Sequence, residues 1–221
     1  MKIDPMKKLS QYHRTWRKFM AFWTKYYDLN EDYIGWALHH AEILQFDRYE
    51  TLCVETHMQR NLYFVSEGLL ARAQIDPDTG RRTIYQIAGA NQALFTRYHR
   101  YSRSTPPGDI VALKRTFVVK IPYKAINVFV PDDLPLSKLV LVLGERNDKD
   151  QIRLSDVKTH RKAEPRYRSF FTMMPDYRDV LTIHQQADLL EMSPTAIKSF
   201  RRVLLKAERE GKLDSYNTYL R

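Results

Sequence analysis

Residues 182–206 read TIHQQADLLEMSPTAIKSFRRVLLK. Ile183, Ala187 and Leu190 recur at spacings of four and three, which predicts a helix with one apolar face. At residues 193–194, Ser-Pro is typical of a second helix start, because serine caps free backbone N–H groups and proline fits the first turn. The stretch therefore predicts two short helices joined by a turn, which is the layout of a helix-turn-helix.

The second predicted helix carries its positive charge on one side. Ile197, Phe200 and Leu204 recur at three and four spacing and would face inward. The opposite face could enter a DNA major groove, with its N-terminal residues at base edges and its basic residues on phosphates. The alternative is an ordinary helical hairpin with a solvated basic face. The candidate DNA-binding residues are Thr195, Lys198, Ser199, Arg201, Arg202 and Lys206, and Arg209 extends their positive charge.

Two residues of the stretch are unusual for such a motif. Gln186 stands at an inward position, where an apolar side chain is usual. Glu191 stands in the turn, where glycine is usual because it accepts a positive φ without strain. The sequence therefore leaves open whether this helix-turn-helix still reads DNA.

The composition favours a globular protein with a polyanionic partner. The chain has 221 residues, 43% of them hydrophobic, which suits one or two domains with real cores. Its 36 basic and 26 acidic residues give a net charge of +10, and such an excess favours nucleic acid as the partner. A basic surface that binds nothing is the alternative.

The expected compartment is the cytoplasm, with no membrane partner. Cys53 is the only cysteine, so no intramolecular disulfide can form and a reducing compartment is favoured. No apolar run approaches the roughly 18 residues that cross a membrane. The first residues, MKIDPMKKLSQYHRTW, are too polar for a secretory signal.

The N-terminal part predicts an amphipathic basic helix. Residues 7–27 contain no glycine or proline, and apolar side chains recur at three and four spacing between lysines and arginines. We expect this helix to dock onto its own domain. A helix lying on a membrane surface would have a similar pattern and is the alternative.

The middle of the chain predicts short strands followed by a long helix. Between two β-type segments, residues 76–80 read DPDTG, a hairpin turn in which proline presets one dihedral angle and glycine accepts a positive φ. Short strands at this spacing predict a β-barrel or sandwich. After Pro135 the pattern becomes helical again, with one glycine, Gly144, and we expect a helix that is broken or loosened midway.

The order of these elements resembles the Crp/Fnr family of bacterial transcription regulators. Residues 61–75, NLYFVSEGLLARAQI, are similar to the strand-and-glycine segment of that family's cyclic-nucleotide-binding β-roll, and residues 110–126, IVALKRTFVVKIPYKAI, to its last strands. Residues 163–204 are similar to the C-terminal domain of Bacteroidetes-like members. The resemblance is collinear over residues 30–206.

The resemblance implies an α+β fold in four parts. These are an N-terminal helix (1–29), a cyclic-nucleotide-binding-like β-roll of the double-stranded β-helix or jelly-roll type (30–134), a connecting and dimerisation helix (135–160) and a winged helix-turn-helix-like DNA-binding domain (161–221). It also implies a homodimer on double-stranded DNA, with two reading helices in successive major grooves. The expected dimer seam contains Leu139, Val140 and Leu143, and a polar run at 146–150 interrupts it.

The β-roll departs from the pattern of members that bind cyclic nucleotides. Those members carry Gly-Glu and, about ten residues later, an arginine that neutralises the cyclic phosphate. The corresponding residues 89–111 contain no Gly-Glu, and Pro106-Pro107 fall where the arginine and its neighbour should be. We therefore expect no cAMP binding. The roll could be filled by its own side chains or bind an unidentified small-molecule effector, in a possible pocket formed by Phe95, Tyr98, Arg103 and Ser104.

The expected function is that of a dimeric DNA-binding transcription regulator and not an enzyme. No zinc, P-loop, dinucleotide or nucleophile-elbow motif occurs, so neither a cofactor nor a metal is expected. Where family members often have Ser-Arg in the reading helix, this chain has Lys198-Ser199, so an arginine for bidentate guanine contact is missing there. The alternative is a ligand- or partner-binding protein with a degenerate helix-turn-helix that no longer binds DNA.

Overall fold

The chain folds into helices and antiparallel sheets that form two compact units. One unit contains Met1–Ile75 and Tyr85–Asp148, and the other contains Asp76–Ile84 and Lys149–Arg221. The predicted α+β class is confirmed. The computed structural model describes residues 5–55, 60–96, 104, 106–128 and 134–212.

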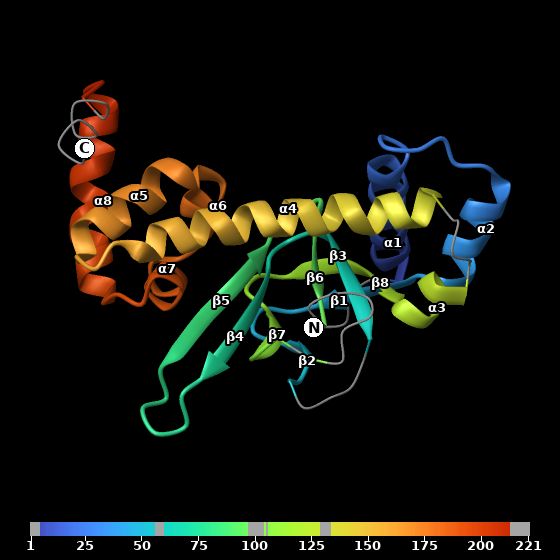
Figure 1. Cartoon of the computed structure of the whole chain (residues 1–221), viewed down its shortest axis with the longest axis horizontal. Helices are drawn as coiled ribbons and strands as arrows, with labels where there is room; N and C mark the ends of the chain where they lie inside the picture. Colours follow the sequence, from blue (N-terminus) through green and yellow to red (C-terminus); the bar gives the residue numbers. More distant parts are fainter. Residues whose placement is uncertain (1–4, 56–59, 97–103, 105, 129–133, 213–221) are drawn as a thin grey trace. The chain divides into compact units, whose positions relative to one another are not determined.

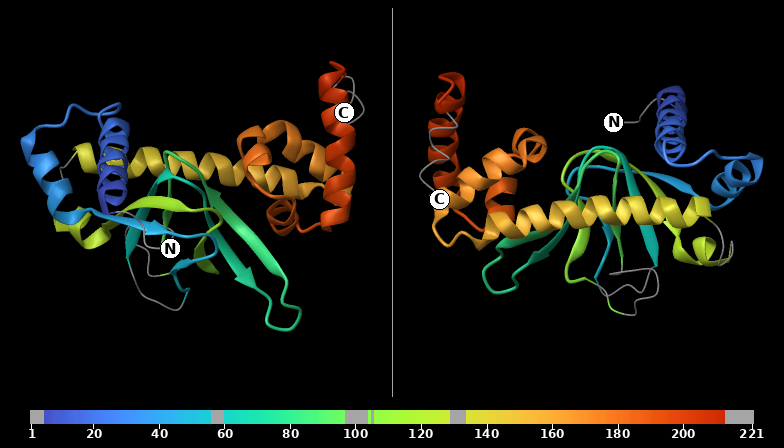
Figure 2. Two further views of the ribbon diagram at one scale, coloured as in Figure 1. Left: turned by 180° about the vertical axis from the view of Figure 1, so that it is seen from behind. Right: turned by 45° about the horizontal axis from the view of Figure 1, so that its top comes forward.

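The first unit is built on a β-roll of two four-stranded antiparallel sheets (Figures 1 and 2). One sheet has the order β1-β8-β3-β6 and the other β2-β7-β4-β5. The strands are β1 (Glu42–Phe46), β2 (Thr51–Cys53), β3 (Asn61–Glu67), β4 (Leu70–Ile75), β5 (Arg82–Ala88), β6 (Gln92–Phe95), β7 (Asp109–Ala112) and β8 (Thr116–Pro122).

Strand β3 is buried on both faces because its two sets of alternating side chains enter different cores. Tyr63 and Val65 belong to a core that also contains residues of β4 and β7, in the other sheet. Leu62 and Phe64 belong to a second core, which includes side chains from the helices. Successive side chains of a strand point to opposite faces, so one seven-residue strand serves both cores.

The turn between β3 and β4 requires a glycine at position 68. Gly68 has φ +97°, and a Cβ atom there would lie 2.5 Å from Oγ1 of Thr116. That same hydroxyl oxygen accepts a hydrogen bond from the backbone N–H of Leu69 at 3.0 Å. Any larger residue at this turn would therefore displace β8 as well as strain the backbone.

Helix α1 (Pro5–Trp23) packs on its own domain (Figure 1). Its Phe19 and Phe22 rings lie 5.2 and 5.1 Å from the ring of Phe64 on β3. The indole N–H of Trp23 donates to the carbonyl oxygen of Pro135 at 3.1 Å. The remaining helices of this core are α2 (Glu31–His40), α3 (Tyr123–Val128) and the first part of α4 (Leu134–Thr159). Among the described residues, no helix has the length and apolar content needed to span a membrane.

Helix α4 is continuous over 26 residues, so the predicted midway break is wrong. A glycine inside a helix costs only about 1 kcal/mol relative to alanine. Contacts on both sides of it hold the helix in place: Leu139 and Leu143 are buried in the core with α1, and Arg146 donates to the hydroxyl of Tyr26 at 2.7 Å. Tertiary packing therefore outweighs the local propensity of one residue.

The second unit contains the C-terminal helices, which begin and end at recognisable signals. They are α5 (Ala163–Met173), α6 (Pro175–Val180), α7 (Ile183–Leu190) and α8 (Pro194–Arg209). Pro175 and Pro194 each occupy the first turn of a helix, where the missing N–H costs nothing. Tyr167, Phe170, Leu190 and Ile197 are fully buried and form part of the core.

Candidate nucleic-acid interface

Helices α7 and α8 are the two helices predicted from residues 182–206. Thr182 and Gln185 form a reciprocal cap: the Thr182 hydroxyl accepts from the Gln185 backbone N–H at 3.3 Å, and the Gln185 side chain accepts from the Thr182 N–H at 3.0 Å. This pairing satisfies two backbone donors that a helix start leaves free. Ser193 caps α8 in the same way by accepting from the N–H of Ala196 at 3.2 Å.

Glu191 occupies the turn between the two helices in the left-handed conformation that glycine would favour. Its φ and ψ are 56° and 45°, and the following N–H, of Met192, donates to the carbonyl of Ala187 at 3.0 Å. Its carboxylate pairs with Nζ of Lys158 at 2.8 Å. The hydrogen bond from Lys158 lowers the pKa of Glu191, so the carboxylate is ionised and locally neutralised.

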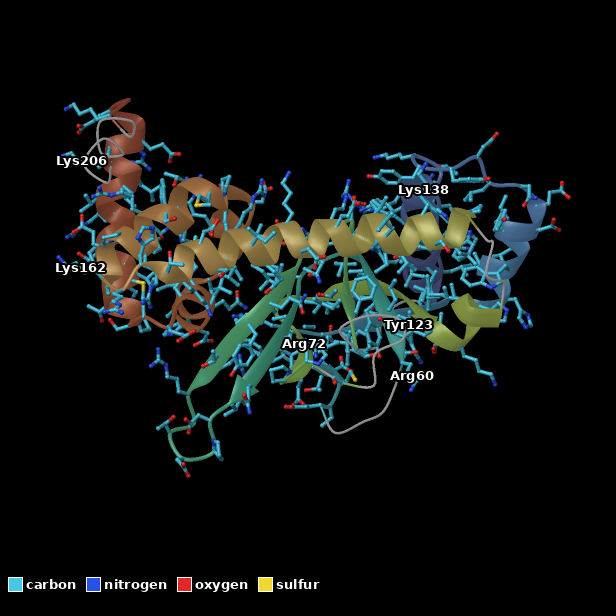
Figure 3. All side chains as sticks on the ribbon, viewed as in Figure 1. Arg60, Arg72, Tyr123, Lys138, Lys162 and Lys206 are labelled. Carbon is cyan, nitrogen blue, oxygen red and sulfur yellow. The ribbon has the colours of Figure 1, made fainter. Side chains whose placement is uncertain are left out.

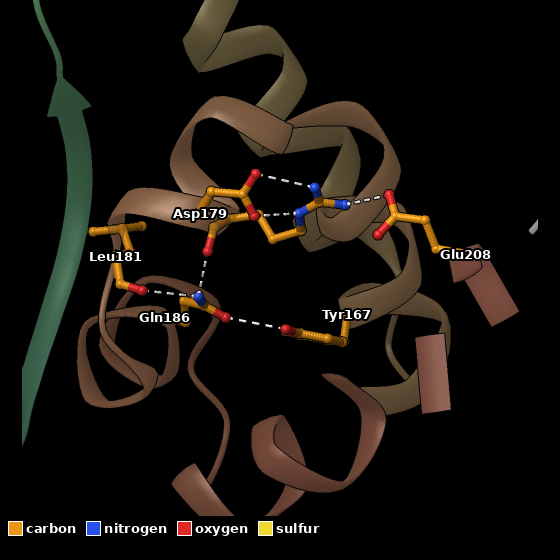
Figure 4. A network of polar contacts seen from close by, with 6 residues as sticks. Tyr167, Asp179, Leu181, Gln186 and Glu208 are labelled. Carbon is orange, nitrogen blue, oxygen red and sulfur yellow. Dashed lines mark hydrogen bonds and ion pairs between the residues drawn. The ribbon is translucent and has the colours of Figure 1, made fainter. Parts of the chain in front are cut away.

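Gln186 is fully buried, and its amide group is fully used (Figure 4). Its oxygen accepts from the hydroxyl of Tyr167 at 3.1 Å. Its nitrogen donates to the carbonyl oxygens of Arg178 and Leu181 at 2.9 and 3.0 Å. A leucine here would leave the Tyr167 hydroxyl and both carbonyl groups without these hydrogen bonds. The polar residue at this inward position therefore stabilises the motif.

Tyr167 connects this buried amide to α8. Burial raises the pKa of Tyr167 to about 12, so its hydroxyl is protonated and able to donate to Gln186. Its ring lies 6.3 Å from the ring of Phe200, which is the partly buried residue on the inner side of α8. Gln186 therefore helps to position the Tyr167 ring, against which Phe200 of α8 packs.

Arg178 fastens the far end of α8 to α6. Its guanidinium binds both carboxylate oxygens of Asp179, at 2.8 and 3.1 Å, and donates to Glu208 on α8 at 3.1 Å. The same group lies 4.2 Å above the ring of Phe171. Sequence reasoning missed Tyr167 and Arg178, because only the fold brings them to Gln186 and Glu208.

The outer face of α8 gathers the predicted DNA-binding residues. Ile197 and Leu204 are buried on its inner face, while Arg201 is partly buried. Figure 3 shows Lys206 on this helix. An open depression of about 610 Å³ lies along the face. Its lining residues are Ile183, Lys198, Arg201, Arg202, Leu205, Lys206 and Arg209. The exposed predicted residues are Thr195, Lys198, Ser199, Arg202 and Lys206.

Most of the cations on this face form no ion pair within the described part of the C-terminal unit. Within residues 134–212, the ion pairs of α8 join Glu208 to Arg178 at 3.1 Å and Glu210 to Lys206 at 3.8 Å. None of these pairs involves the four other cations of α8. Those cations are Lys198, Arg201, Arg202 and Arg209.

Phe95 and Ser104 are the two members of the predicted effector pocket that lie among the described residues. Phe95 packs against the core that contains α1, with its ring 6.5 Å from that of Tyr123. Ser104 is exposed. Tyr98 and Arg103 lie outside the described residues.

The residues expected at a dimer seam lie mainly inside their own chain. Leu139 and Leu143 are 1% and 0% exposed, and Val140 packs partly against the same core. On α4, Leu141 and Ile152 are 60% and 62% exposed instead. The polar run at 146–150 is also used within the chain: Arg146 binds Tyr26, and Asp150 accepts from the hydroxyl of Tyr177 at 2.8 Å.

Comparison with known proteins supports the fold. No family model and no curated protein matches the sequence. A cyclic nucleotide-binding domain containing protein from Listeria monocytogenes EGD-e matches with TM-score 0.64 and 11% identity, over 89% of this chain and 91% of that one. FixK2 from Bradyrhizobium japonicum matches with TM-score 0.60 and 14% identity, over 77% and 86%.

A putative transcriptional regulator of the Crp/Fnr family from Eubacterium rectale matches with TM-score 0.59 and 17% identity. This match covers 83% of the present chain and 86% of that one. The chain therefore has the fold of Crp/Fnr family transcription regulators, as the resemblance predicted.

Proposed function

We propose that this protein is a dimeric DNA-binding transcription regulator, with α7 and α8 as its reading motif. The observation that carries the proposal is the outer face of α8, where Lys198, Arg201, Arg202 and Arg209 form no ion pair within residues 134–212. Cations collected on one helix face are suited to neutralising successive DNA phosphates. The Crp/Fnr-like fold is consistent with this role.

The residues of the same face suggest that it binds DNA mainly through phosphates and distinguishes base sequences weakly. Thr195 and Ser199 are exposed near the start of α8, where reading helices approach base edges. Their hydroxyls make single hydrogen bonds and cannot make the bidentate contact that arginine makes to guanine. We expect phosphate contacts by Lys198, Arg202 and Lys206 to provide most of the binding free energy.

The proposed dimer pairs two copies of α4 through Leu141 and Ile152. These side chains are about three helical turns apart and therefore share one face of the continuous helix. Gly144 lies one turn beyond Leu141, and nothing lies within 4 Å of the place where its Cβ would be. Gly144 leaves room for a second helix backbone beside Leu141, while Glu145 and Asp148 lie between Leu141 and Ile152 on the same face.

The β-roll is proposed as a sensor-type domain that does not bind cAMP. Pro106-Pro107 stand where the family resemblance places an arginine, and proline offers neither charge nor N–H. Titration calorimetry with cAMP should give no heat of binding, and a measurable saturable heat would overturn this part of the proposal. Along the chain, we assign residues 30–134 to the β-roll, residues 135–160 to the dimerisation helix and residues 161–221 to the DNA-binding domain.

Binding to a library of genomic fragments tests the proposed function. Changing Lys198, Arg201 and Arg202 together to alanine should abolish most binding. It should also reduce the slope of log affinity against log salt by about one for each phosphate that the variant no longer binds. The matched control changes Lys25, Lys114 and Lys124, three exposed lysines of the other unit, and removes the same charge.

Three outcomes are distinguishable. Loss of binding in the α8 variant but not in the control supports the assigned face. Equal loss in both variants means that net charge alone attracts DNA. A folded wild-type dimer that binds no DNA at low salt supports the alternative, a partner- or ligand-binding protein with a degenerate helix-turn-helix.

A further inference from the structure

The depression along α8 combines apolar and cationic lining residues. Its volume of about 610 Å³ lies within the range of about 300–1,000 Å³ that is usual for small-molecule sites. Ile183, the first residue of α7, and Leu205 of α8 line it with apolar side chains, and both are only half-buried. Apolar surface is therefore left open to solvent between charged groups, and the apolar part of a ligand could cover it.

The five polar side chains of the lining are all hydrogen-bond donors. They are Lys198, Arg201, Arg202, Lys206 and Arg209. Lysine and arginine side chains donate hydrogen bonds and do not accept them. A peptide or a sugar would bring N–H or O–H donors that find no acceptor among these side chains. A ligand whose polar atoms only accept, such as a carboxylate, avoids this mismatch.

Arg201 is the best-placed anchor for such an anion. It is half-buried, whereas Lys198 and Arg202 are exposed, so its side chain has less freedom to lose on binding. The planar guanidinium matches a carboxylate through two parallel hydrogen bonds. The neighbouring carboxylate of Asp179 does not occupy it, because both Asp179 oxygens bind Arg178, at 2.8 and 3.1 Å.

The depression is long and follows the helix. Its lining residues on α8 extend from Lys198 to Arg209. At 1.5 Å per residue, this stretch covers about 16 Å of the helix axis. An extended alkyl chain suits such a strip, with its length along α8 and its carboxylate on the cationic rim.

We propose that the depression binds a free amphipathic carboxylate, of the chemical class of a medium-chain fatty acid. The alkyl chain covers Ile183 and Leu205, and the carboxylate binds Arg201. The bound anion neutralises charge that DNA phosphates would otherwise contact, so it weakens DNA binding. The effect on DNA rests on the proposed function, whereas ligand binding itself does not.

Titration of the whole chain with decanoate tests the site directly. Isothermal titration calorimetry should show saturable binding below the concentration at which decanoate forms micelles. Acetate has the carboxylate but no chain, and decyltrimethylammonium has the chain but the opposite charge. Each should bind at least about tenfold more weakly than decanoate, because each lacks one of the two matching features. Absence of saturable decanoate binding, or equal binding of decanoate and decyltrimethylammonium, would overturn the proposal.

Two substitutions on α8 separate the apolar floor from general apolar surface. Leu205→Asn should weaken decanoate binding by about tenfold, because the chain loses its apolar contact. Val203→Asn is the matched control: Val203 is 48% exposed and does not line the depression, so the affinity should not change. Equal losses in the two variants would contradict the assigned floor.

A second pair of variants does not depend on how Leu205→Asn folds. Lys198→Gln changes an exposed side chain of the rim and should weaken decanoate binding by about threefold, as expected for the loss of one nearby charge. Lys25→Gln removes the same charge from an exposed position in the other unit and should have no effect. Equal affinities of the two variants would count against the rim.

Competition with DNA separates this inference from the proposed function. Saturating decanoate should weaken DNA binding by the wild type at least about fivefold, because it neutralises part of the phosphate-binding charge. Binding of decanoate without any binding of DNA would contradict the proposed function and support the ligand site. Binding of DNA without decanoate would overturn the ligand site alone. Co-sedimentation with phosphatidylglycerol vesicles, without saturable decanoate binding, would assign the face to a membrane surface and overturn the proposal as well.

Discussion

The hydroxyl of Tyr167 and the side-chain amide of Gln186 meet 3.1 Å apart in the buried centre of the C-terminal helices. The relationship joins α5 to α7 and, through the contact between Tyr167 and Phe200, reaches the inner side of α8. A glutamine at an inward position of this helix-turn-helix therefore does not indicate a degenerate motif, because each of its polar side-chain atoms has a hydrogen-bond partner.

Gln186→Leu should destabilise the C-terminal unit by about 3 kcal/mol, because the Tyr167 hydroxyl and two carbonyl groups lose their partner in a buried site. Urea unfolding followed by circular dichroism measures the effect. Adding Tyr167→Phe should recover part of the loss, since one unsatisfied group is then absent. A second substitution that adds its full separate cost would contradict the pairing.

Glu191→Gly should stabilise the unit by roughly 1 kcal/mol, because a left-handed residue with a side chain costs about 1–2 kcal/mol. The lost ion pair with Lys158 offsets little of this, since surface pairs contribute about 0–1 kcal/mol. The thermal midpoint is the measurement. Glu191→Ala loses the ion pair and keeps the strain, so a midpoint for the alanine variant equal to that of the glycine variant would refute the explanation.

The docking of α1 should weaken in acid. Glu67 pairs with Arg14 at 2.8 Å and also with Lys18. Burial alone would raise the pKa of Glu67, but the hydrogen bond and charge of Lys18 together with Arg14 lower it. A carboxyl whose folded pKa is depressed stabilises above its unfolded pKa, near 4.5, and loses that contribution as pH falls through the lower folded pKa.

The test compares the pH dependence of unfolding in the wild type and Glu67→Gln, followed by tryptophan fluorescence. The wild type should lose stability below about pH 5 more steeply than the variant, because the variant lacks this titrating group. Parallel curves would mean that Glu67 contributes nothing to the docking of α1.

Leu141→Glu should convert the proposed dimer to a monomer without lowering the stability of the β-roll. The side chain is 60% exposed, so the chain's own core does not need it. Light scattering after size-exclusion chromatography measures the mass. Leu143→Ala is the contrasting variant: it is buried, so it should cost about 2–5 kcal/mol of stability. A Leu141→Glu protein that stays dimeric would place the interface elsewhere.

Much of the fold could be predicted from local patterns. Apolar spacing predicted both helices of residues 182–206, and their capping residues predicted where they begin. Short strands at regular spacing predicted a β-barrel or sandwich, and the resemblance of residues 61–75 and 110–126 to a known family predicted the β-roll. These features depend on neighbours close in sequence, where periodicity and turn chemistry act.

Contacts between residues far apart in sequence could not be predicted from local patterns. The continuity of α4 depends on α1 and the roll, which hold Leu143 and Arg146 in place, and no pattern within α4 contains that information. Arg72 offered one signal, a charge among the buried residues of the first part of β4. Its hydrogen-bond acceptors, the carbonyl oxygens of Phe95 and Gly108, are separated from it by 23 and 36 positions, so only the folded sheet brings them together.

The single cysteine, Cys53, is expected to react slowly with thiol reagents. The thiol is 7% exposed, and its pKa is raised chiefly by burial, so little of the reactive thiolate form is present near neutral pH. A cysteine introduced at an exposed site would therefore be the one readily labelled thiol of the chain. Oxidative cross-linking or a spin label placed at Leu141 could then report on α4 in the otherwise unaltered protein.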